Sequence, residues 1–434
     1  MLVVGLAMLI VVIMLTLSVP VMYSFITAVF ILVYHLKLDP SFMLPYGFDV
    51  LNAVVMLCVP LYILVGNIMQ KSAIGEALVD FIDLFVGNIR GGLGVVSVYS
   101  SAVFGAISGS CNATLVCIGS VMLPKMYDQG YPKGHAAALI TNAAPLGLLI
   151  PPSSTMIIYA WVARQSILAC FLATVLPGLF LATTLSITNL VMLRNNTNIQ
   201  LVEKKYGRER WDEIKTKTKW GTPALLMPII VLGGTYSGIF TPTESAAIAV
   251  FYAIPVGFLF YKKLTLRFLM EALLDAAETT GSVLVMSFGI MILSRLLIMQ
   301  ELPELMMGVL KSISKDPRVI LLIINLMLLG LGMIMDDLSA MLLSVPILVP
   351  VVASFGVHPV HLAAIVGVNL GLGVITPPCA PLLYLGSRVS GVSALEMLPP
   401  TMWFILFAWF PTLIAVTYFP ELSLWLPKLV LGTV

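Results

Sequence analysis

The sequence predicts an all-α polytopic membrane protein, and three observations carry this prediction. Of its 434 residues, 59% are hydrophobic and only 10% are charged, and the mean hydropathy is +1.04. Soluble domains carry about 25% charged residues, so this chain lacks the polar surface that water requires. The apolar residues gather in long blocks, as bilayer-spanning helices of roughly 20 residues do. A net charge of only +2 gives no indication of nucleic-acid binding.

The apolar blocks leave room for about ten to fourteen crossings or half-crossings. The first block starts at Met1 without a basic region or a small-residue cleavage site, so we expect a retained helix rather than a signal peptide. The blocks lie at 1–18, 20–36, 50–70, 93–124, 134–163 and 166–193, and then at 222–240, 244–261, 280–299, 318–351, 360–387 and 400–419.

Two blocks, 93–124 and 318–351, are too long for one perpendicular span and are interrupted by small or polar residues. The interruptions are Ser108-Gly109-Ser110-Cys111-Asn112 and Met335-Asp336-Asp337-Leu338-Ser339. We expect two re-entrant helical hairpins with non-helical tips. Such tips must face protein or water, because lipid cannot satisfy free backbone groups.

The blocks at 134–163 and 360–387 are each broken by a double proline, Pro151-Pro152 in the first and Pro377-Pro378 in the second. Proline removes a backbone donor and clashes with the preceding helical turn. We therefore expect two discontinuous helices.

One strongly polar segment, 194–221, separates the two sets of blocks. Its basic excess predicts the cytoplasmic side of the membrane. With Trp211 and Trp220, it fits an amphipathic helix on the membrane surface, and a plain solvated loop fits equally well.

The unusual features recur at one spacing, which predicts a duplicated unit, 1–200 and 222–434. The loop 125–133 carries two lysines and its counterpart 351–359 carries none, so positive-inside bias predicts an inverted repeat. Lys311, Lys315 and Arg318 at the second hairpin argue against inversion. A shift of 226 residues superimposes Pro124 on Pro350, Gly130 on Gly356, His135 on His361, Gly147 on Gly373, Pro151-Pro152 on Pro377-Pro378, and Ser110 on Asp336.

Inverted repeats with broken helices are typical of secondary transporters, which bind their substrate near the membrane midplane. Unwound carbonyls and hydroxyls can coordinate Na⁺, and helix N-termini favour anions. We expect two pseudo-symmetric Na⁺ sites, although the same small residues also permit close helix packing. The candidate oxygen donors lie in the tip Ser108-Gly109-Ser110-Cys111-Asn112 and the break Gly147 to Pro152 of the first half, and at Asp336, Ser339 and the break Gly373 to Pro378, with the Thr376 hydroxyl, in the second.

Other ionisable residues give weaker signals. The five cysteines and four histidines are too dispersed for a zinc or haem site. Thr241-Pro242-Thr243-Glu244 is a helix start, which explains Glu244 as well as a functional role does. Arg295 and Arg388 could meet an anion, although a role as interfacial anchor explains each of them better. No paired set of catalytic groups indicates an enzyme.

Six motifs, in order over nearly the whole chain, resemble the large membrane subunit of tripartite ATP-independent periplasmic (TRAP) transporters. They are Phe104-Gly-Ala-Ile-Ser-Gly-Ser-Cys-Asn-Ala-Thr with Ile118-Gly-Ser-Val-Met-Leu-Pro, Gly147-Leu-Leu-Ile-Pro-Pro-Ser, Tyr236-Ser-Gly-Ile-Phe-Thr-Pro-Thr-Glu-Ser-Ala-Ala, Met333-Ile-Met-Asp, and Ile375-Thr-Pro-Pro.

The resemblance implies a Na⁺-driven importer of carboxylates such as C4-dicarboxylates or sialic acids, located in the bacterial inner membrane. It implies two partners: a periplasmic solute-binding protein, and a separate small membrane subunit of about four helices. It also implies an elevator mechanism, in which the two hairpins and two broken helices slide against a fixed scaffold. Carried over residue by residue, the resemblance implies a first Na⁺ site around Ser108, Gly109, Gly147, Ile150 and Pro152, and a second near Asp336, Gly373, Thr376 and Pro378. The substrate cavity is expected near Asn112, Ser153, Ser339, Cys379 and Arg295.

Two segments depart from the family pattern, Cys111-Asn112 at the first tip and Cys379-Ala380-Pro381 after the second double proline. Both lie near the expected substrate cavity, so the sequence defines the substrate less well than the fold.

One alternative is a stand-alone Na⁺- or H⁺-coupled carboxylate carrier that needs no binding protein. An intramembrane enzyme needs a clustered acidic motif beyond Asp336-Asp337. A proton-channel subunit needs mid-membrane Lys and Glu residues, which are mostly absent.

Overall fold

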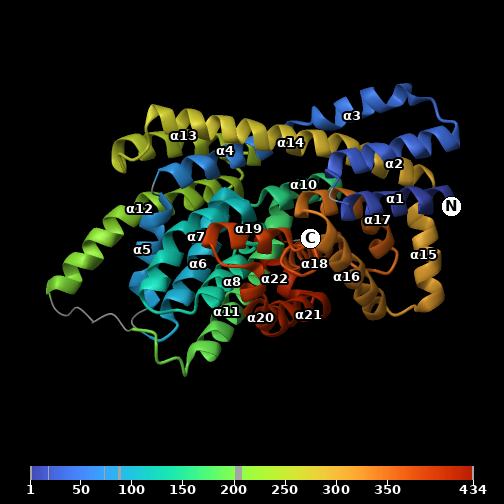
Figure 1. Ribbon diagram of the computed structural model, residues 1–434. Coiled ribbons are helices and arrows are strands. Elements are labelled where there is room, and N and C mark those ends of the chain that lie inside the picture. Colours follow the sequence, from blue (N-terminus) through green and yellow to red (C-terminus); the bar gives the residue numbers. More distant parts are fainter. Residues whose placement is uncertain (1, 18, 73, 87–88, 201–207, 433–434) are drawn as a thin grey trace.

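The computed structural model describes residues 2–17, 19–72, 74–86, 89–200 and 208–432, and over these ranges the chain is helical with no strand (Figure 1). Six of the described helices are long and apolar enough to cross a membrane, and a bent pair, Lys133–Leu149 with Ser154–Val162, raises the number to seven. The prediction of an all-helical polytopic chain is therefore confirmed.

The first part of the chain forms helices α1 to α5, joined by short 3₁₀ turns at Pro40–Phe42 and Val54–Leu57. The amphipathic helix α5 packs against α6 and α12. The bounds are Leu2–Thr16 for α1, Val21–Leu36 for α2, Met43–Leu51 for α3, Cys58–Lys71 for α4 and Ile74–Val86 for α5.

A pair of packed helices follows at the predicted first hairpin, α6 (Gly92–Ser108) and α7 (Cys111–Asp128). Only Gly109 and Ser110 separate them, so the non-helical tip is shorter than the five residues expected. Gly109 has φ 59°, a left-handed conformation that glycine adopts readily. The Ser110 hydroxyl accepts from the Ala113 N–H and begins α7.

The predicted first broken helix consists of α8 (Lys133–Ala143), α9 (Leu146–Leu149) and α10 (Ser154–Val162), with a bend of 43° at the break. Ser153 begins α10 by accepting from the Met156 N–H. The 27-residue helix α11 (Ile167–Leu193) then packs against α8, α9 and α10.

The second part repeats this order. The pair α16 and α17 is separated by Met335 and Asp336, and α18 and α19 flank the second double proline. The bounds are Arg208–Tyr236 for α12, Pro242–Pro255 for α13, Leu266–Met299 for α14, Leu302–Ile313 for α15, Pro317–Ile334 for α16, Asp337–Ala353 for α17, Pro359–Gly373 for α18, Pro381–Ser390 for α19, Ala394–Phe404 for α20, Phe410–Tyr418 for α21 and Glu421–Leu431 for α22, with π-helical turns at Val256–Phe260 and Ile405–Trp409.

Helix starts in the two parts agree with the 226-residue spacing. Cys111 and Asp337, which differ by 226, are the first residues of α7 and α17. Lys133 and Pro359 begin α8 and α18 in the same way. Both double prolines are joined by a cis peptide bond.

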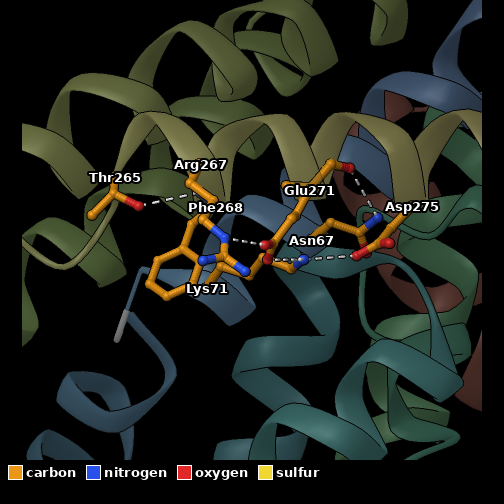
Figure 2. A network of polar contacts seen from close by, with 8 residues as sticks. Asn67, Lys71, Thr265, Arg267, Phe268, Glu271 and Asp275 are labelled. Carbon is orange, nitrogen blue, oxygen red and sulfur yellow. Dashed lines mark hydrogen bonds and ion pairs between the residues drawn. The ribbon is translucent and has the colours of Figure 1, made fainter.

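The segment α3–α4 runs antiparallel to α14. Lys71 at the end of α4 forms ion pairs with Glu271 (3.5 Å) and Asp275 (2.8 Å) near the start of α14 (Figure 2). At the other end of α14, the Arg295 guanidinium lies over the ring of Tyr46 in α3, 5.9 Å from its centroid. Because residues 43–71 correspond to 269–297 at the shift of 226, two equivalent segments pack in opposite directions.

Several boundaries differ from those expected. In the basic segment, residues 194–200 form turns and irregular structure, and residues 208–221 are the first half of one 29-residue helix, α12, that continues into the apolar block. Residues 201–207 of the segment lie outside the described residues. Helix α14 starts at Leu266 rather than near 280. The apolar block at 280–299 is therefore only the second half of a helix whose first half carries polar residues.

Candidate functional site

The first hairpin tip lies directly against the first helix break. The Ser154 hydroxyl donates to the Gly109 carbonyl at 2.8 Å and so ties the tip to the start of α10. A Cβ added at Gly109 would lie 3.1 Å from the Ser154 nitrogen and 3.3 Å from the Pro152 carbonyl oxygen. The tip and the break therefore meet through backbone atoms, as a glycine allows.

Oxygen atoms converge at Gly147, on the other side of this contact. A Cβ added there would lie 3.1 Å from the Thr114 hydroxyl and 3.3 Å from the Ser110 carbonyl oxygen. The Thr114 hydroxyl donates to that carbonyl at 2.7 Å, and the Ser108 hydroxyl lies 3.2 Å from Thr114. These neutral, buried oxygens are of the type that coordinates Na⁺ in transporters with broken helices.

Glycine contacts permit this approach in both halves. In the first, Gly105 of α6 faces Gly147, whose added Cβ would lie 3.1 Å from the Gly105 Cα. In the second, a Cβ added at Gly373 would lie 2.6 Å from the Cα of Gly332 in α16. Any larger side chain at these contacts would push the first hairpin helix away from the broken helix.

The second tip is built around a charge instead of hydroxyls. Asp336 begins α17 by accepting from the Ser339 N–H at 3.2 Å. Thr376, in the break after α18, donates to the Leu372 carbonyl in the last turn of that helix at 2.6 Å. Ser110 and Ser154 of the first half correspond at the shift of 226 to Asp336 and Ala380. The second half thus replaces hydroxyl oxygens with a carboxylate.

One hydrogen bond joins the two halves at their tips. The Thr155 hydroxyl, in the first turn of α10, donates to a carboxylate oxygen of Asp337 at 3.1 Å. The first turns of α10 and α17 therefore lie side by side, and both helices present N-terminal N–H groups, which favour an anion.

The remaining predicted residues fall in different places. Asn112 is exposed on α7, Pro378 is exposed, and Cys379 is half-buried. Ile150 ends α9, and its side chain packs on Gly178 of α11. Ser153 is fully buried as the N-cap of α10, and Ser339 is buried beside Met286, with 3.9 Å between its hydroxyl and the sulfur.

Arg295 is brought to Tyr46, not to the tips. It is exposed and lies nine residues beyond Met286, or about 13 Å along α14 at 1.5 Å per residue. Glu244 and Thr241 form a capping box at the start of α13, so the helix start predicted at Thr241 is confirmed.

Sequence reasoning missed three residues that the tips bring together: Thr114, Ser154 and Thr155. Thr114 lies one turn after Ser110, so its hydroxyl returns to the tip carbonyl. The other two follow the double proline, where Ser154 contacts the first tip and Thr155 contacts the second. A helical-wheel reading of α7 could have found Thr114, but the other two contacts are tertiary.

Comparisons with known proteins agree with this arrangement. A family model described as "Tripartite ATP-independent periplasmic transporter, DctM component" matches residues 7–422. The C4-dicarboxylate TRAP transporter large permease protein DctM of Rhodobacter capsulatus is 35% identical over 86% of this chain and 87% of that protein. The sialic acid TRAP transporter large permease protein SiaM of Vibrio cholerae is 35% identical over 87% of each chain.

A longer relative and a solved structure add to this. The isethionate TRAP transporter permease protein DctMQ of Oleidesulfovibrio alaskensis is 31% identical over 87% of this chain, which spans only 59% of that protein. The YdaH transporter of Alcanivorax borkumensis shares the fold, with a TM-score of 0.62 at 14% identity over 86% of both chains. The chain therefore belongs to the family of DctM components of tripartite ATP-independent periplasmic transporters, and it is a transporter permease subunit, not an enzyme.

Proposed function

We propose that the chain is the transport subunit of a Na⁺-coupled importer of small organic acids in the bacterial inner membrane. The observation that carries this proposal is the approach of the Ser110 and Thr114 oxygens to Gly147 at the first break, with the Ser108 hydroxyl beside Thr114. Neutral oxygens beside unwound backbone suit a cation, and bound Na⁺ would hold the tip and the break together.

The second Na⁺ site would use the Asp336 carboxylate with the free backbone near Gly373, Thr376 and Pro378. A negative ligand there compensates for the hydroxyls that this half lacks. The family membership, with relatives named for C4-dicarboxylates and sialic acid, supports a carboxylate substrate. Its anionic group would meet the N-terminal turns of α10 and α17.

The antiparallel packing of α3–α4 on α14 supports an inverted repeat, with units 1–200 and 222–434. In this arrangement the moving part comprises the hairpins α6–α7 and α16–α17 with the broken helices α8–α10 and α18–α19. The scaffold comprises α2–α4 and α12–α14. Sliding of the first part against the second would carry the substrate across the membrane.

Two partners complete the proposed importer: a periplasmic solute-binding protein and a small membrane subunit. The fused DctMQ relative, about two fifths of which lies outside the match, supports a small subunit that is a separate chain here. A stand-alone Na⁺- or H⁺-coupled carrier that needs no binding protein is the competing function.

The test is uptake into proteoliposomes that contain this chain and its small membrane subunit. Radiolabelled C4-dicarboxylates, sialic acid and isethionate are supplied with and without the solute-binding protein and an inward Na⁺ gradient. We expect uptake only when both are present. Uptake that needs Na⁺ alone establishes the stand-alone carrier, and uptake that ignores the Na⁺ gradient overturns the coupling.

A further inference from the structure

The first half of α12 differs in charge from the second. The helix begins at Arg208, at one edge of the molecule (Figure 1), and basic residues outnumber acidic ones as far as Trp220. From Gly221 to Tyr236 the helix carries no charged residue. One continuous helix therefore leads from a charged, mainly basic end into an apolar end.

One face of the charged half packs on α5. The Lys217 ammonium pairs with the Asp83 carboxylate of α5 at 3.0 Å, and a Cβ added at Gly221 would lie 2.6 Å from the Phe81 Cβ of the same helix. Lys217 and Gly221 are four residues apart and so lie on the same face of α12. This face is covered by the protein itself.

The opposite face carries three cations in one line, which we call the basic row: Arg208, Lys215 and Lys219. Their sequence spacing places them on one side of a helix with 3.6 residues per turn, about half a turn away from Lys217. All three are exposed. Within the described residues, none of the three side chains has an ion pair or a hydrogen bond, so their charges are free to meet an anion.

The same line of α12 becomes apolar further along the helix. Leu226 continues the basic row and Ile229 lies about one turn beyond it, and their side chains are 40% and 63% exposed. Lys219 and Leu226 are about 10 Å apart along the axis at 1.5 Å per residue. A bilayer holds about 30 Å of hydrocarbon within a total of about 40–45 Å, so a headgroup layer of about 5–8 Å lies on each side. With Leu226 among the acyl tails, Lys219 lies at headgroup level, and the flexible side chain of Lys215 reaches the same level from about 6 Å further out.

A second element marks this level independently. The helical stretch Pro242–Phe260 is long and apolar enough to cross a membrane, and after Tyr261 it is followed by the exposed pair Lys262-Lys263. The rings of Trp220 and Phe260 lie 5.2 Å apart, and the Tyr261 hydroxyl donates to the Trp220 carbonyl at 2.6 Å. The end of this span is thus fixed beside the charged half of α12. Aromatic residues followed by lysines are typical of the membrane–water interface on the cytoplasmic side.

A phospholipid with a net negative headgroup fits this surface. Its phosphate would meet the ammonium groups of Lys215 and Lys219, and its acyl tails would lie along Leu226 on the same face. A soluble anion would contact the cations alone. Anionic lipids give the cytoplasmic leaflet a negative surface potential that attracts basic segments beside a span, and the basic excess of this segment predicts that same side.

We propose that Lys215 and Lys219, together with Lys262 and Lys263, bind the headgroups of anionic phospholipids in the cytoplasmic leaflet. Bound lipid would fix the depth of α12 and α13 in the membrane. Because both helices belong to the proposed scaffold, the sliding part would then move against a frame held at the membrane surface. The inference goes beyond the proposed function and needs neither Na⁺ nor a carboxylate substrate.

The first test measures lipid affinity with the purified, delipidated full chain in detergent. Its unfolding temperature is followed against increasing dioctanoyl-phosphatidylglycerol, which is anionic, or dioctanoyl-phosphatidylcholine, which has no net charge. We expect the anionic lipid to bind at least about tenfold more tightly, which corresponds to about 1.4 kcal/mol. Glycerol phosphate, a soluble anion without acyl chains, should not stabilise the protein. Equal affinities for the two lipids, or equal stabilisation by glycerol phosphate, overturn the proposal.

The same titration tests the lysines of the basic row. Lys215→Gln with Lys219→Gln should remove the preference for the anionic lipid. The control pair, Arg164→Gln with Arg210→Gln, removes the same charge from two exposed positions, one after α10 and one on the α5 side of α12. This pair should keep the preference.

A second test pair, Lys262→Gln with Lys263→Gln, should also weaken binding of the anionic lipid. It replaces the first pair if that variant is not monodisperse on size-exclusion chromatography. Full preference for the anionic lipid in the test variants overturns the proposal, and so does its loss in the control pair.

Photolabelling in nanodiscs tests the location without any substitution. Phosphatidylglycerol with a diazirine in its headgroup should label peptides from 208–222 and 261–267 more strongly than phosphatidylcholine with the same group. Equal labelling by the two lipids, or labelling confined to other segments, overturns the proposal. In native membranes, p-benzoylphenylalanine in place of Thr222, an exposed residue between Lys219 and Leu226, should capture no protein. A captured protein would be the occupant of this face instead of lipid and would likewise overturn the proposal.

Discussion

Asp336 combines two roles that can be separated at the level of single atoms. Its carboxylate accepts from the Ser339 N–H as the N-cap of α17, and its charge is the proposed Na⁺ ligand. Asparagine caps helices about as well as aspartate, because the side-chain oxygen remains. Asp336→Asn therefore removes the negative charge of the side chain and keeps the helix cap.

We therefore expect Asp336→Asn to retain the thermal stability of the purified protein. The Na⁺ concentration for half-maximal uptake should rise at least about tenfold, or about 1.4 kcal/mol. Asp336→Ala, the control, should lose stability as well because it removes the cap. Ser108→Ala tests the first site in the same assay. Unchanged Na⁺ activation in both Asp336→Asn and Ser108→Ala would contradict the two proposed sites.

Gly105 decides how closely α6 approaches the first break. A Cβ added there would overlap the Gly147 Cα, and a backbone atom cannot yield as a flexible side chain can. Overpacking of this kind costs about 1–3 kcal/mol. Gly105→Ala should therefore lower the unfolding temperature, although alanine is the better helix former by about 1 kcal/mol.

The matched control for Gly105 is Gly330→Ala in α16, where an added Cβ has no atom within 4 Å. That variant should be neutral or slightly more stable in a detergent melt. Equal unfolding temperatures for the two variants would show that the contact of α6 with the break is looser than the structure indicates.

At the scale of elements, the tip of the first hairpin rests on α4 of the proposed scaffold. An added Cβ at Gly66 lies 3.7 Å from the Ala113 Cβ. The mean Cβ–Cβ distance of a disulfide is about 3.8 Å, so a cysteine pair there has the spacing to close. The same added Cβ lies 3.1 Å from the Ser108 Cβ, so Ser108 must shift slightly to admit it.

We expect Gly66→Cys with Ala113→Cys, in a background without the five native cysteines, to form a disulfide on oxidation. If the hairpin moves against α4 during transport, the bond should abolish uptake, and a reductant should restore it. The single cysteine variants control for the substitutions themselves. Full uptake by the completely cross-linked protein would rule out movement of this hairpin relative to α4.

The whole molecule offers a direct test of inversion. Asp128 at the end of α7 and Ser354 at the end of α17 differ by 226 and are both exposed. In an inverted repeat the two residues face opposite sides of the membrane, with Asp128 in the cytoplasm beside Lys125 and Lys133.

A membrane-impermeant thiol reagent should therefore label Ser354→Cys in intact spheroplasts and Asp128→Cys only after permeabilisation. The control is the cysteine-free background, which should remain unlabelled in both conditions. Labelling of both positions from the same side would mean that the repeat is parallel and that the antiparallel packing of α3–α4 on α14 has another origin.

The sequence alone determined the helical class, the breaks and the spacing of the two halves. Long apolar blocks need a bilayer, double prolines end helices by their own geometry, and glycine with serine makes a tip locally. These are properties of neighbouring residues, so they can be read without a fold. The helix start at Thr241 was predicted for the same reason.

Only the tertiary structure decided which polar groups meet. Thr155 reaches Asp337 across 182 positions of sequence, and Ser154 reaches Gly109 across 45. Arg295 has the charge to suit an anion, but the packing of α14 on α3 directs it to Tyr46. Contacts of this kind depend on how helices pack, which residue type and local spacing do not specify.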